Sequence, residues 1–380
     1  MNFFEGDYQV QVLTEIGPEE SIWNDFHFQS PHLQSSYLQA LEKVQPPDMK
    51  FRYVIVRKDN SIVGGAYLQI VHFSGRNFSQ HGSVLLVSFL KLFFRVKKIR
   101  LMFCGNILSI DLPCMRFNEE EISFMKFTDI IQKISSEEKC QLLMLKELVL
   151  SSGQLAFLSQ AGFRSYTEDM TMAMEIKTSW KMFDDYYNSL KKKYRKRLAK
   201  IRAAKKSLIV RRLSKPEINQ HLPAIGKLFN QTAARQFLRM GIIDERYFSL
   251  MNEVYEGRFF IKGYFLNDEL IAFASHVVHE TMLEVHYIGI NYAYNEKHLL
   301  YFNILYDGIE EAIMQKKKIL ELGRTAREAK ASAGCKPVPS HDYLYVKNRF
   351  INFLISLFEK IFLEDLGEEW NNRNPFKAQI

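Results

Sequence analysis

The sequence predicts a mixed α/β (α+β) fold built from two similar halves, and three observations support this prediction. The chain has 380 residues, which is long for one hydrophobic core and suits two domains of ordinary size. Hydrophobic residues make up 47% and charged residues 25% of it, the balance of a folded protein. The order helix, hairpin, strand, helix, strand occurs twice, so we expect each half to hold a mixed central sheet flanked by helices.

In the first half, a predicted helix over residues 35–44 ends at the pair Pro46-Pro47. Residues 51–56 and 62–71 are rich in β-formers, and the turn signal between them predicts a hairpin. The elements expected after the hairpin are a strand over 99–110, a helix over 119–139, a short strand over 142–145, a helix over 151–162 and a closing strand over 171–176.

The second half repeats this order with little sequence identity. Its expected elements are a helix over 216–240, a hairpin of 258–264 and 270–278, a strand over 282–290, a helix over 298–315 and a short strand over 319–322. We therefore place an N-terminal domain at 1–177, a basic interdomain helix at 178–212 and a C-terminal domain at 213–380. The last domain ends in an amphipathic helix over 348–366, for which packing on its own domain and contact with a membrane surface are both open.

The formal net charge of +8 favours anionic partners. The four cysteines form neither a CxxC pair nor a metal-ligand spacing with histidine, so we predict no metal site and interpret them as reduced thiols of a cytoplasmic protein. We see no signal-peptide pattern, and the longest apolar stretch, 82–90, is too short to span a bilayer. We expect a cytoplasmic protein, with peripheral contact at the inner membrane face as an open possibility.

A basic segment follows the first half and begins with SLKKKYRKRL at 189–198. Its apolar residues recur at helical spacing, which predicts a helix with one buried stripe and many cations. Because adjacent like charges destabilise a helix, a bound anion would relieve a real cost. We predict that Lys192, Arg195 and Lys196 bind an anionic ligand, with RNA, a nucleotide sugar and a lipid phosphate as candidates. A solvated helix face is the alternative interpretation.

The predicted strand over 282–290 carries a carboxylate and an imidazole. Alternation places Glu284 and His286 on one face and Tyr287 on the other. Such a pair could remove a proton from an attacking ammonium group. A histidine satisfied within the core is the alternative.

A second polar cluster follows the short strand over 319–322, in the segment ELGRTAREAK at 321–330. Gly323 lets the chain turn or approach a ligand closely after Glu321. Arg324, Thr325 and Lys330 then project from the next turn or helix, and polar loops at strand ends are where sites are built. An exposed surface patch is the alternative.

These segments resemble a known group of enzymes. The stretch FLSQAGF at 157–163 followed by TMAM at 171–174 resembles the end of a GNAT acyltransferase domain. Two such domains joined by a basic helix resemble the Fem-type peptidoglycan aminoacyltransferases. The match rests on SLKKKYRKRL, VHYIGI at 285–290 and ELGRTAREAK with Gly334 and Pro337 after it, and more weakly on FCGNILS at 103–109.

The resemblance implies two tandem GNAT-like domains and an N-acyltransferase or aminoacyltransferase that moves an acyl group from an activated donor to an amine acceptor, for which a cell-envelope precursor is one candidate. Lys330 matches a lysine at the transfer centre of Fem-type enzymes, where it would hold the donor carbonyl or its oxyanion. We assign catalytic roles to Lys330, Glu284, His286 and Arg324. We assign substrate-binding roles to Lys192, Arg195, Lys196, Tyr287, Glu321, Gly323 and Thr325.

The expected co-substrate is acyl-CoA or aminoacyl-tRNA, with no tightly bound cofactor. Acetyl-CoA enzymes cradle a pyrophosphate with a glycine-rich loop after the central strand. Here that place reads NYAYNEKH at 291–298, without glycine, and Fem-type enzymes show a similar loss. The expected partner is an anionic donor or acceptor, namely CoA, tRNA or a nucleotide- or lipid-phosphate precursor; the oligomeric state is open. The rival hypothesis is a non-catalytic module that binds RNA or a phosphorylated glycan or lipid precursor.

Overall fold

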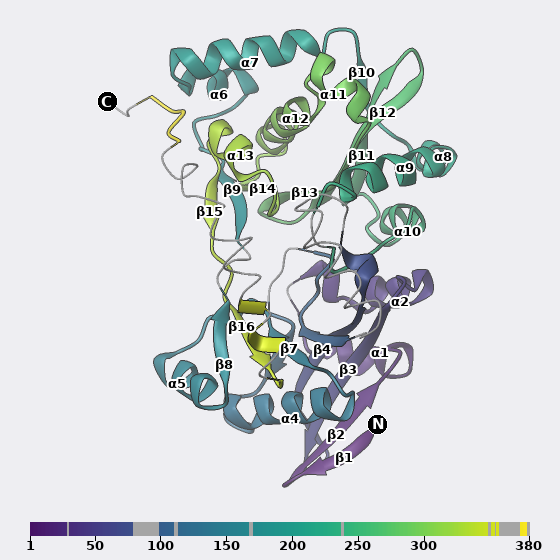
Figure 1. Cartoon of the computed structure of the whole chain (residues 1–380), viewed down its shortest axis with the longest axis vertical. Helices are drawn as coiled ribbons and strands as arrows, with labels where there is room; N and C mark the ends of the chain where they lie inside the picture. The colour runs from purple at the N-terminus through teal and green to yellow at the C-terminus, as the bar shows by residue number, and fades with distance from the viewer. Residues whose placement is uncertain are drawn as a thin grey trace. The chain divides into compact units, whose positions relative to one another are not determined.

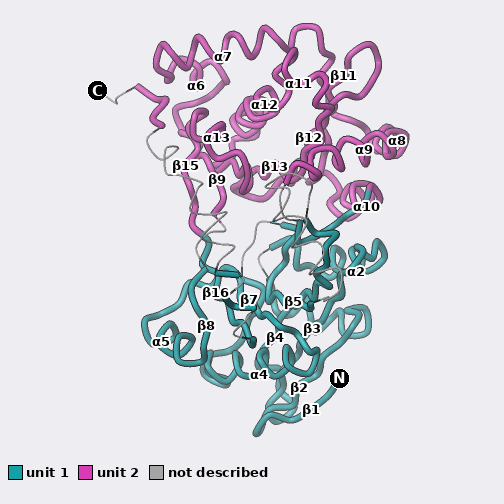
Figure 2. The backbone as a smooth tube through the Cα atoms, in the orientation of Figure 1, with its two compact units in different colours: residues 1–169, 237–244, 340–364 teal, residues 170–236, 245–339, 365–380 magenta. Residues whose placement is uncertain are grey.

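The computed structural model describes residues 1–28, 30–78, 99–109, 113–166, 170–236, 239–348, 351–353, 355–356 and 373–377. It divides into two compact units (Figure 2). Unit 1 consists of Met1–Asp169, Phe237–Asp244 and Ser340–Glu364, and unit 2 of Met170–Gln236, Glu245–Pro339 and Asp365–Ile380. Each unit is thus assembled from three chain segments, whereas the sequence analysis divides the chain into contiguous domains.

Unit 1 is built on a mixed sheet with the order β1-β2-β3-β4-β5-β7-β16-β8, and β6 pairs with β4 (Figure 1). Its strands are β1 (Asn2–Glu5), β2 (Tyr8–Leu13), β3 (Met49–Lys58), β4 (Ser61–Phe73), β5 (Ile99–Cys104), β6 (Met115–Phe117), β7 (Leu142–Leu145), β8 (Phe163–Tyr166) and β16 (Asp342–Val346). Its helices are α1 (Glu20–Asp25), α2 (Ser35–Val44), α4 (Phe124–Glu137), α5 (Ser152–Gln160) and the 3-10 turns η1 (Gly17–Glu19), η2 (Pro31–Leu33) and η3 (Gly75–Asn77).

Two adjacent glycines of β4, Gly64 and Gly65, let two segments pack closely on the sheet. A Cβ on Gly64 would collide with Phe127 of α4, and a Cβ on Gly65 would collide with Phe26. Helix α4 begins at Phe124 rather than at residue 119, because the side chain of Ser123 accepts the Lys126 N–H at 3.2 Å and caps the helix there.

Unit 2 is built on a second sheet with the order β10-β11-β12-β13-β14-β9-β15 (Figure 1). Its strands are β9 (Thr171–Glu175), β10 (Ile209–Arg212), β11 (Phe259–Leu266), β12 (Glu269–Val278), β13 (Met282–Ile290), β14 (Ile319–Glu321) and β15 (Lys336–Val338). Its helices are α6 (Phe183–Ser189), α7 (Lys192–Ala204), α8 (Lys215–Gln220), α9 (Leu222–Ala233), α10 (Arg246–Val254), α11 (Tyr292–His298), α12 (Leu300–Met314) and α13 (Arg327–Ala333). Two mixed sheets flanked by helices confirm the predicted fold class.

Two strands, β9 and β16, each join the sheet that is built mainly from the other half of the chain. The sequence analysis assigns 171–176 as the closing strand of the first half, but β9 pairs with β14 and β15 of unit 2. Its Met172 and Met174 are buried in the core of that unit. The slot left in unit 1 is filled by β16, which pairs antiparallel with both β7 and β8.

Other elements differ from expectation for local reasons. The helix predicted over 216–240 is two helices, α8 and α9, because Pro223 lies in the first turn of α9 and cannot donate to the preceding turn. The basic segment is helical only to Ala204 and continues as strand β10. Of the amphipathic helix predicted over 348–366, residues 351–353 and 355–356 are helical, and most of the remainder lies outside the described residues.

Two further expectations concern cysteines and membrane spans. Cys104, Cys114, Cys140 and Cys335 are free and buried. Among the helices in the described part of the chain, none is long and apolar enough to cross a membrane.

A buried ion pair fixes β16 in unit 1. The Nζ atom of Lys146 lies 3.0 Å from Oδ2 of Asp342, and both side chains are almost fully buried. The other carboxylate oxygen of Asp342 accepts the backbone N–H of Glu147 at 2.9 Å. Because Lys146 follows β7 and Asp342 begins β16, this pair joins strands nearly two hundred residues apart in sequence.

We predict that Asp342→Asn destabilises the protein by about 3–5 kcal/mol, because it leaves the Lys146 ammonium buried without its counter-charge. Equilibrium urea denaturation measures the change. The matched control introduces Asp342→Asn into a Lys146→Met background, where we expect a much smaller loss. An equal loss in both backgrounds would assign the effect to the Glu147 amide instead of the ion pair.

Candidate active site

The two central parallel strands of unit 2 separate after a short paired stretch. β13 has nine residues, but β14 pairs only with its first three, and the last pair in register is Glu284 with Glu321. In unit 1, the corresponding parallel strands β5 and β7 end together, at the pair Cys104 and Leu145. Ligands of α/β sheets bind beyond the carboxyl ends of strands, where neighbours part. The separation of β13 from β14 therefore marks unit 2 as the place for a site.

Glu284 and Glu321 point to the same face of the sheet. Gly308 of α12 lies against Val285, Leu320 and Leu322 on one face. Because side chains alternate along a strand, the two carboxylates face away from α12. This face is covered by α9 and α10, which contribute aromatic side chains beside β13.

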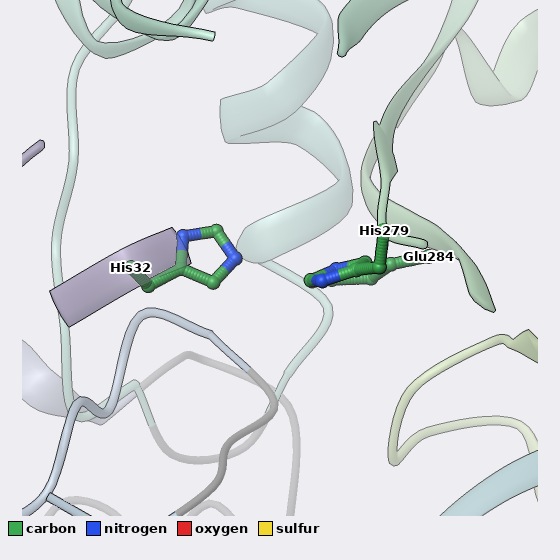
Figure 3. A group of neighbouring side chains, drawn as sticks. All are labelled: His32, His279 and Glu284. Atoms are coloured by element: carbon green, nitrogen blue, oxygen red, sulfur yellow. The ribbon is translucent and has the colours of Figure 1, made fainter. Parts of the chain in front are cut away.

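A hydrogen-bonded row of four side chains runs through Glu284. Its two carboxylate oxygens lie 2.6 Å from Nδ1 of His286 and 3.0 Å from Nε2 of His279, and Figure 3 shows the His279 ring against Glu284. The hydroxyl of Tyr247 on α10 lies 2.8 Å from Nε2 of His286. Because an ionised carboxylate only accepts hydrogen bonds, both histidines donate to it. Nε2 of a neutral His286 is then an acceptor, and Tyr247 donates to it.

A β-bulge sets the direction of His286 and Tyr287. The register passes from Ala274–Ile288 to His276–Val285, so Ser275 alone opposes these two residues. The Ser275 hydroxyl accepts the Tyr287 N–H at 3.0 Å and donates to the Tyr287 carbonyl at 3.1 Å. The prediction that Tyr287 points to the face opposite His286 is wrong, because the bulge brings the two rings to 4.3 Å.

Glu321 is a buried carboxyl group held by two donors. Oε1 accepts the Gly323 N–H at 2.8 Å, and Oε2 accepts the Thr171 hydroxyl at 3.2 Å. Burial, helped by the charge of the neighbouring Glu284, raises the pKa of Glu321 to about 7. Glu321 is therefore close to half protonated at neutral pH, which suits a group that exchanges protons.

Lys330 lies on α13 and reaches back to the end of β14. Its Nζ donates to the Gly323 carbonyl at 3.1 Å, and Gly323 adopts a left-handed φ of +79° that favours glycine. Burial lowers the pKa of Lys330 to about 8. The residue is 3% exposed, so the alternative of an exposed surface patch is wrong for Lys330. Arg324 is half-buried and Thr325 exposed on the same loop.

The predicted anion-binding residues lie elsewhere in unit 2. Lys192 and Lys196 are exposed on α7, and Arg195 is half-buried. Helix α7 packs against α11 and α12, on the side of the sheet away from Glu284. The structure therefore brings Glu284, His286 and Tyr287 together, and Glu321, Gly323 and Lys330 together beside them, and separates both groups from the basic helix.

A family model and solved structures identify what this chain is similar to. A family model described as peptidoglycan biosynthesis and recognition, FemAB-like, matches residues 120–378, which is more than half of the chain. This chain belongs to the FemAB-like family. The family assignment confirms the resemblance to Fem-type transferases and supports an acyl or aminoacyl transferase. No curated protein matches the sequence.

Two solved structures show the fold of this FemAB-like chain. The crystal structure of FemX is 13% identical, covers 91% of this chain and 99% of its own, and has a TM-score of 0.53. A tandem GNAT protein from the clavulanic acid biosynthesis pathway is 9% identical, covers 90% and 99%, and also has a TM-score of 0.53. The likeness extends to the fold and confirms the tandem GNAT-like architecture.

Sequence reasoning missed three members of the site. Tyr247 lies on α10, 39 positions before His286, and no spacing rule links them. His279 follows the predicted strand over 270–278 and Ser275 lies within it, and neither carries a sequence signal that links it to Glu284. The sequence signal for this site is the pair Glu284 and His286. Their partners come from elements that only the tertiary structure brings beside them.

The raised pKa of Glu321 predicts a pH-dependent effect on stability. The folded state keeps a proton that the unfolded chain has released, so this group's stabilising contribution is full below pH 4.5 and is lost as the pH rises through 7. Glu321→Gln should match the wild type near pH 4.5 and exceed it by roughly 3 kcal/mol at pH 8. Denaturation across this pH range measures the difference. The exposed Glu256→Gln is the control, and a flat Glu321→Gln difference would contradict the raised pKa.

Proposed function

We propose that unit 2 transfers an acyl or aminoacyl group from an activated donor to an amine of a cell-envelope precursor. The row Tyr247–His286–Glu284–His279 carries this proposal, because it offers a proton acceptor where β13 and β14 separate. The family description, peptidoglycan biosynthesis and recognition, supports an envelope precursor as acceptor.

The row provides a route for the proton that an attacking ammonium group must lose. The Tyr247 oxygen accepts that proton while its own passes to Nε2 of His286. Glu284, on Nδ1, stabilises the imidazolium that forms. The amine nitrogen bonds to the donor carbonyl carbon and the carbon–oxygen bond of the donor ester breaks. The ammonium nitrogen loses two protons in all: one passes through His286 to the leaving oxygen, and the other is released to solvent. An amide, a free hydroxyl and one proton are the products.

Lys330 is the proposed source of positive charge for the oxyanion intermediate. Its ammonium lies in a dry setting at the loop after β14, where a fixed charge acts more strongly than in water. Its neighbour Arg324 on the same loop adds a second cation. Both charges would strengthen their contact with the donor as the carbonyl oxygen becomes negative.

The end of β13 favours aminoacyl-tRNA over acyl-CoA as the donor. A pyrophosphate cradle needs free N–H groups at the amino end of the helix that follows the strand. Here α11 occupies the place of that loop, and the Asn295 side chain accepts the Tyr301 N–H at 3.1 Å, in the first turn of α12. The Tyr301 N–H is therefore already used in a hydrogen bond within the chain. An acyl donor linked through an ester, which needs no pyrophosphate cradle, fits better.

The catalytic proposal predicts the activities of two variants. His286→Ala should lower turnover by about 10²–10⁴-fold, because the proton acceptor is lost, and Tyr247→Phe should lower it by a smaller factor. Amide formation can be measured by mass spectrometry, with charged tRNA or acyl-CoA pools as donors and amine-bearing envelope precursors as acceptors. His341→Ala, an exposed histidine of unit 1, is the matched control. Failure of the wild type to form product from either pool would favour the non-catalytic binding module.

A separate prediction concerns Lys330→Met, which keeps the side-chain length and removes the charge. Turnover should fall by about 10²–10³-fold with a smaller change in donor affinity. The pKa of Lys330 is lowered, so its stabilising contribution is full above pH 10.5 and is lost as the pH falls through 8. The variant should therefore melt no lower than the wild type at pH 7. Normal turnover would end the catalytic role, and a lower melting temperature would indicate a structural one.

A further inference from the structure

Two sets of cations on and beside α7 differ in their partners. The paired set consists of Arg202 and Lys205 at the carboxyl end of α7 and the half-exposed Arg212 on β10. Its partners are the α12 acids Asp307, Glu310 and Glu311. Asp307, which is almost fully buried, lies 2.5 Å from Nη1 of Arg202 and 2.6 Å from Nζ of Lys205. These cations are neutralised within the fold, and the pairs of Arg202 and Lys205 hold the end of α7 on α12.

The outward set consists of exposed lysines that have no such partners among the residues that the structure describes. Lys192, Lys196 and Lys200 are exposed and recur every four residues, so they form one row along α7 with a spacing of about 6 Å. Lys193 and Lys206 are exposed beside the row. Residues 190–216 contain no Asp or Glu. Within the described residues, none of these five lysines has a carboxylate within 4 Å, and the row is therefore a strip of uncompensated charge.

The strip lies on the helix that packs against α11, the helix that follows β13. Helix α11 begins directly after β13, and α7 packs on α11. The carbonyl of Ala204 and the hydroxyl of Ser207 both lie 3.3 Å from Nδ1 of His298, at the end of α11. Since ligands of such a sheet bind beyond the carboxyl ends of its strands, the strip is one helix away from that edge.

We propose that the strip of Lys192, Lys193, Lys196, Lys200 and Lys206 binds the phosphodiester backbone of RNA, as the docking surface for the tRNA body of the donor. This inference rests on the proposed function and adds the surface that the donor uses. The strip extends over residues 192–206, about 20 Å along the helix, and a single phosphate would engage only a small part of it. A nucleic acid backbone presents a charge at each nucleotide along such a length.

An anionic membrane is the less favoured occupant. A helix that lies on a membrane inserts an apolar face beside its cations. The apolar residues of α7, Leu198 and Ile201, are buried in the core of unit 2. The exposed neighbours of the lysines on the outer face include Ala199 and Ala203, which are too small to anchor a helix in lipid.

The test is the binding of deacylated bulk tRNA to the full chain over a range of salt concentrations. Lys192→Ala, Lys196→Ala and Lys200→Ala combined should weaken binding by about 10- to 100-fold and make the slope of log K against log salt less steep by about 2 to 3. The control combines Lys215→Ala, Lys227→Ala and Lys318→Ala, three exposed lysines outside the strip, and removes the same net charge. It should leave affinity and slope near those of the wild type.

Each other outcome overturns the inference. Equal effects of the two triple variants would reduce the strip to a contribution to net charge. Binding of phosphatidylglycerol vesicles, with no measurable binding of tRNA, would make it a membrane contact. The proposed function is tested separately: if the strip variant loses tRNA binding while amide formation proceeds from acyl-CoA alone, the strip binds RNA but the proposed donor is wrong. If tRNA binding persists in the strip variant while His286→Ala abolishes transfer, the function stands and the docking surface does not.

Discussion

The site of this FemAB-like protein depends on the carboxylate of Glu284. It occupies the last register pair between β13 and β14, and each of its oxygens accepts a hydrogen bond from a histidine. A buried charge is tolerated only when such donors replace the water it has lost. In return the carboxylate fixes the tautomer of His286, and this tautomer makes Nε2 an acceptor for the hydroxyl of Tyr247. In the proposed mechanism, the direction of proton transfer follows from this arrangement.

Two ionisable groups near the end of β14, Glu321 and Lys330, add to the electrostatics of the candidate site. Burial raises the pKa of Glu321 to about 7 and lowers that of Lys330 to about 8, so both pKa values lie near neutral pH. Gly323 connects them, since its N–H binds the carboxylate and its carbonyl binds the ammonium. Groups whose pKa values are shifted in this way cluster where proton transfer and charge stabilisation occur. In the proposed mechanism, the row Tyr247–His286–Glu284–His279 transfers the proton and the loop after β14 stabilises the charge.

The exchange of strands between the halves makes the units interdependent. β9, which comes from the first half of the chain, completes the sheet that carries Glu321, and it supplies Thr171 as a donor to that carboxylate. β16, from the end of the chain, completes the sheet of unit 1 through the Lys146–Asp342 pair. Neither sheet can therefore form completely without segments that are distant in sequence. The candidate site of unit 2 includes Thr171, which comes from the first half of the sequence.

Local sequence patterns determined most of the helices and strands of this protein. Alternation and turn residues predicted the hairpins and β13 to within a few residues, and local patterns predicted α2 and α12. Alternation also proposed Glu284 and His286 as candidate site residues, whereas Lys330 was proposed from the resemblance to Fem-type enzymes. Tertiary structure alone decided the rest. The exchange of β9 and β16 depends on which edge is free, the bulge at Ser275 overrides alternation at Tyr287, and Tyr247 joins His286 only through packing of α10. Sequence periodicity reports which face of an element is buried, whereas pairing partners are selected by contacts between residues far apart in the chain.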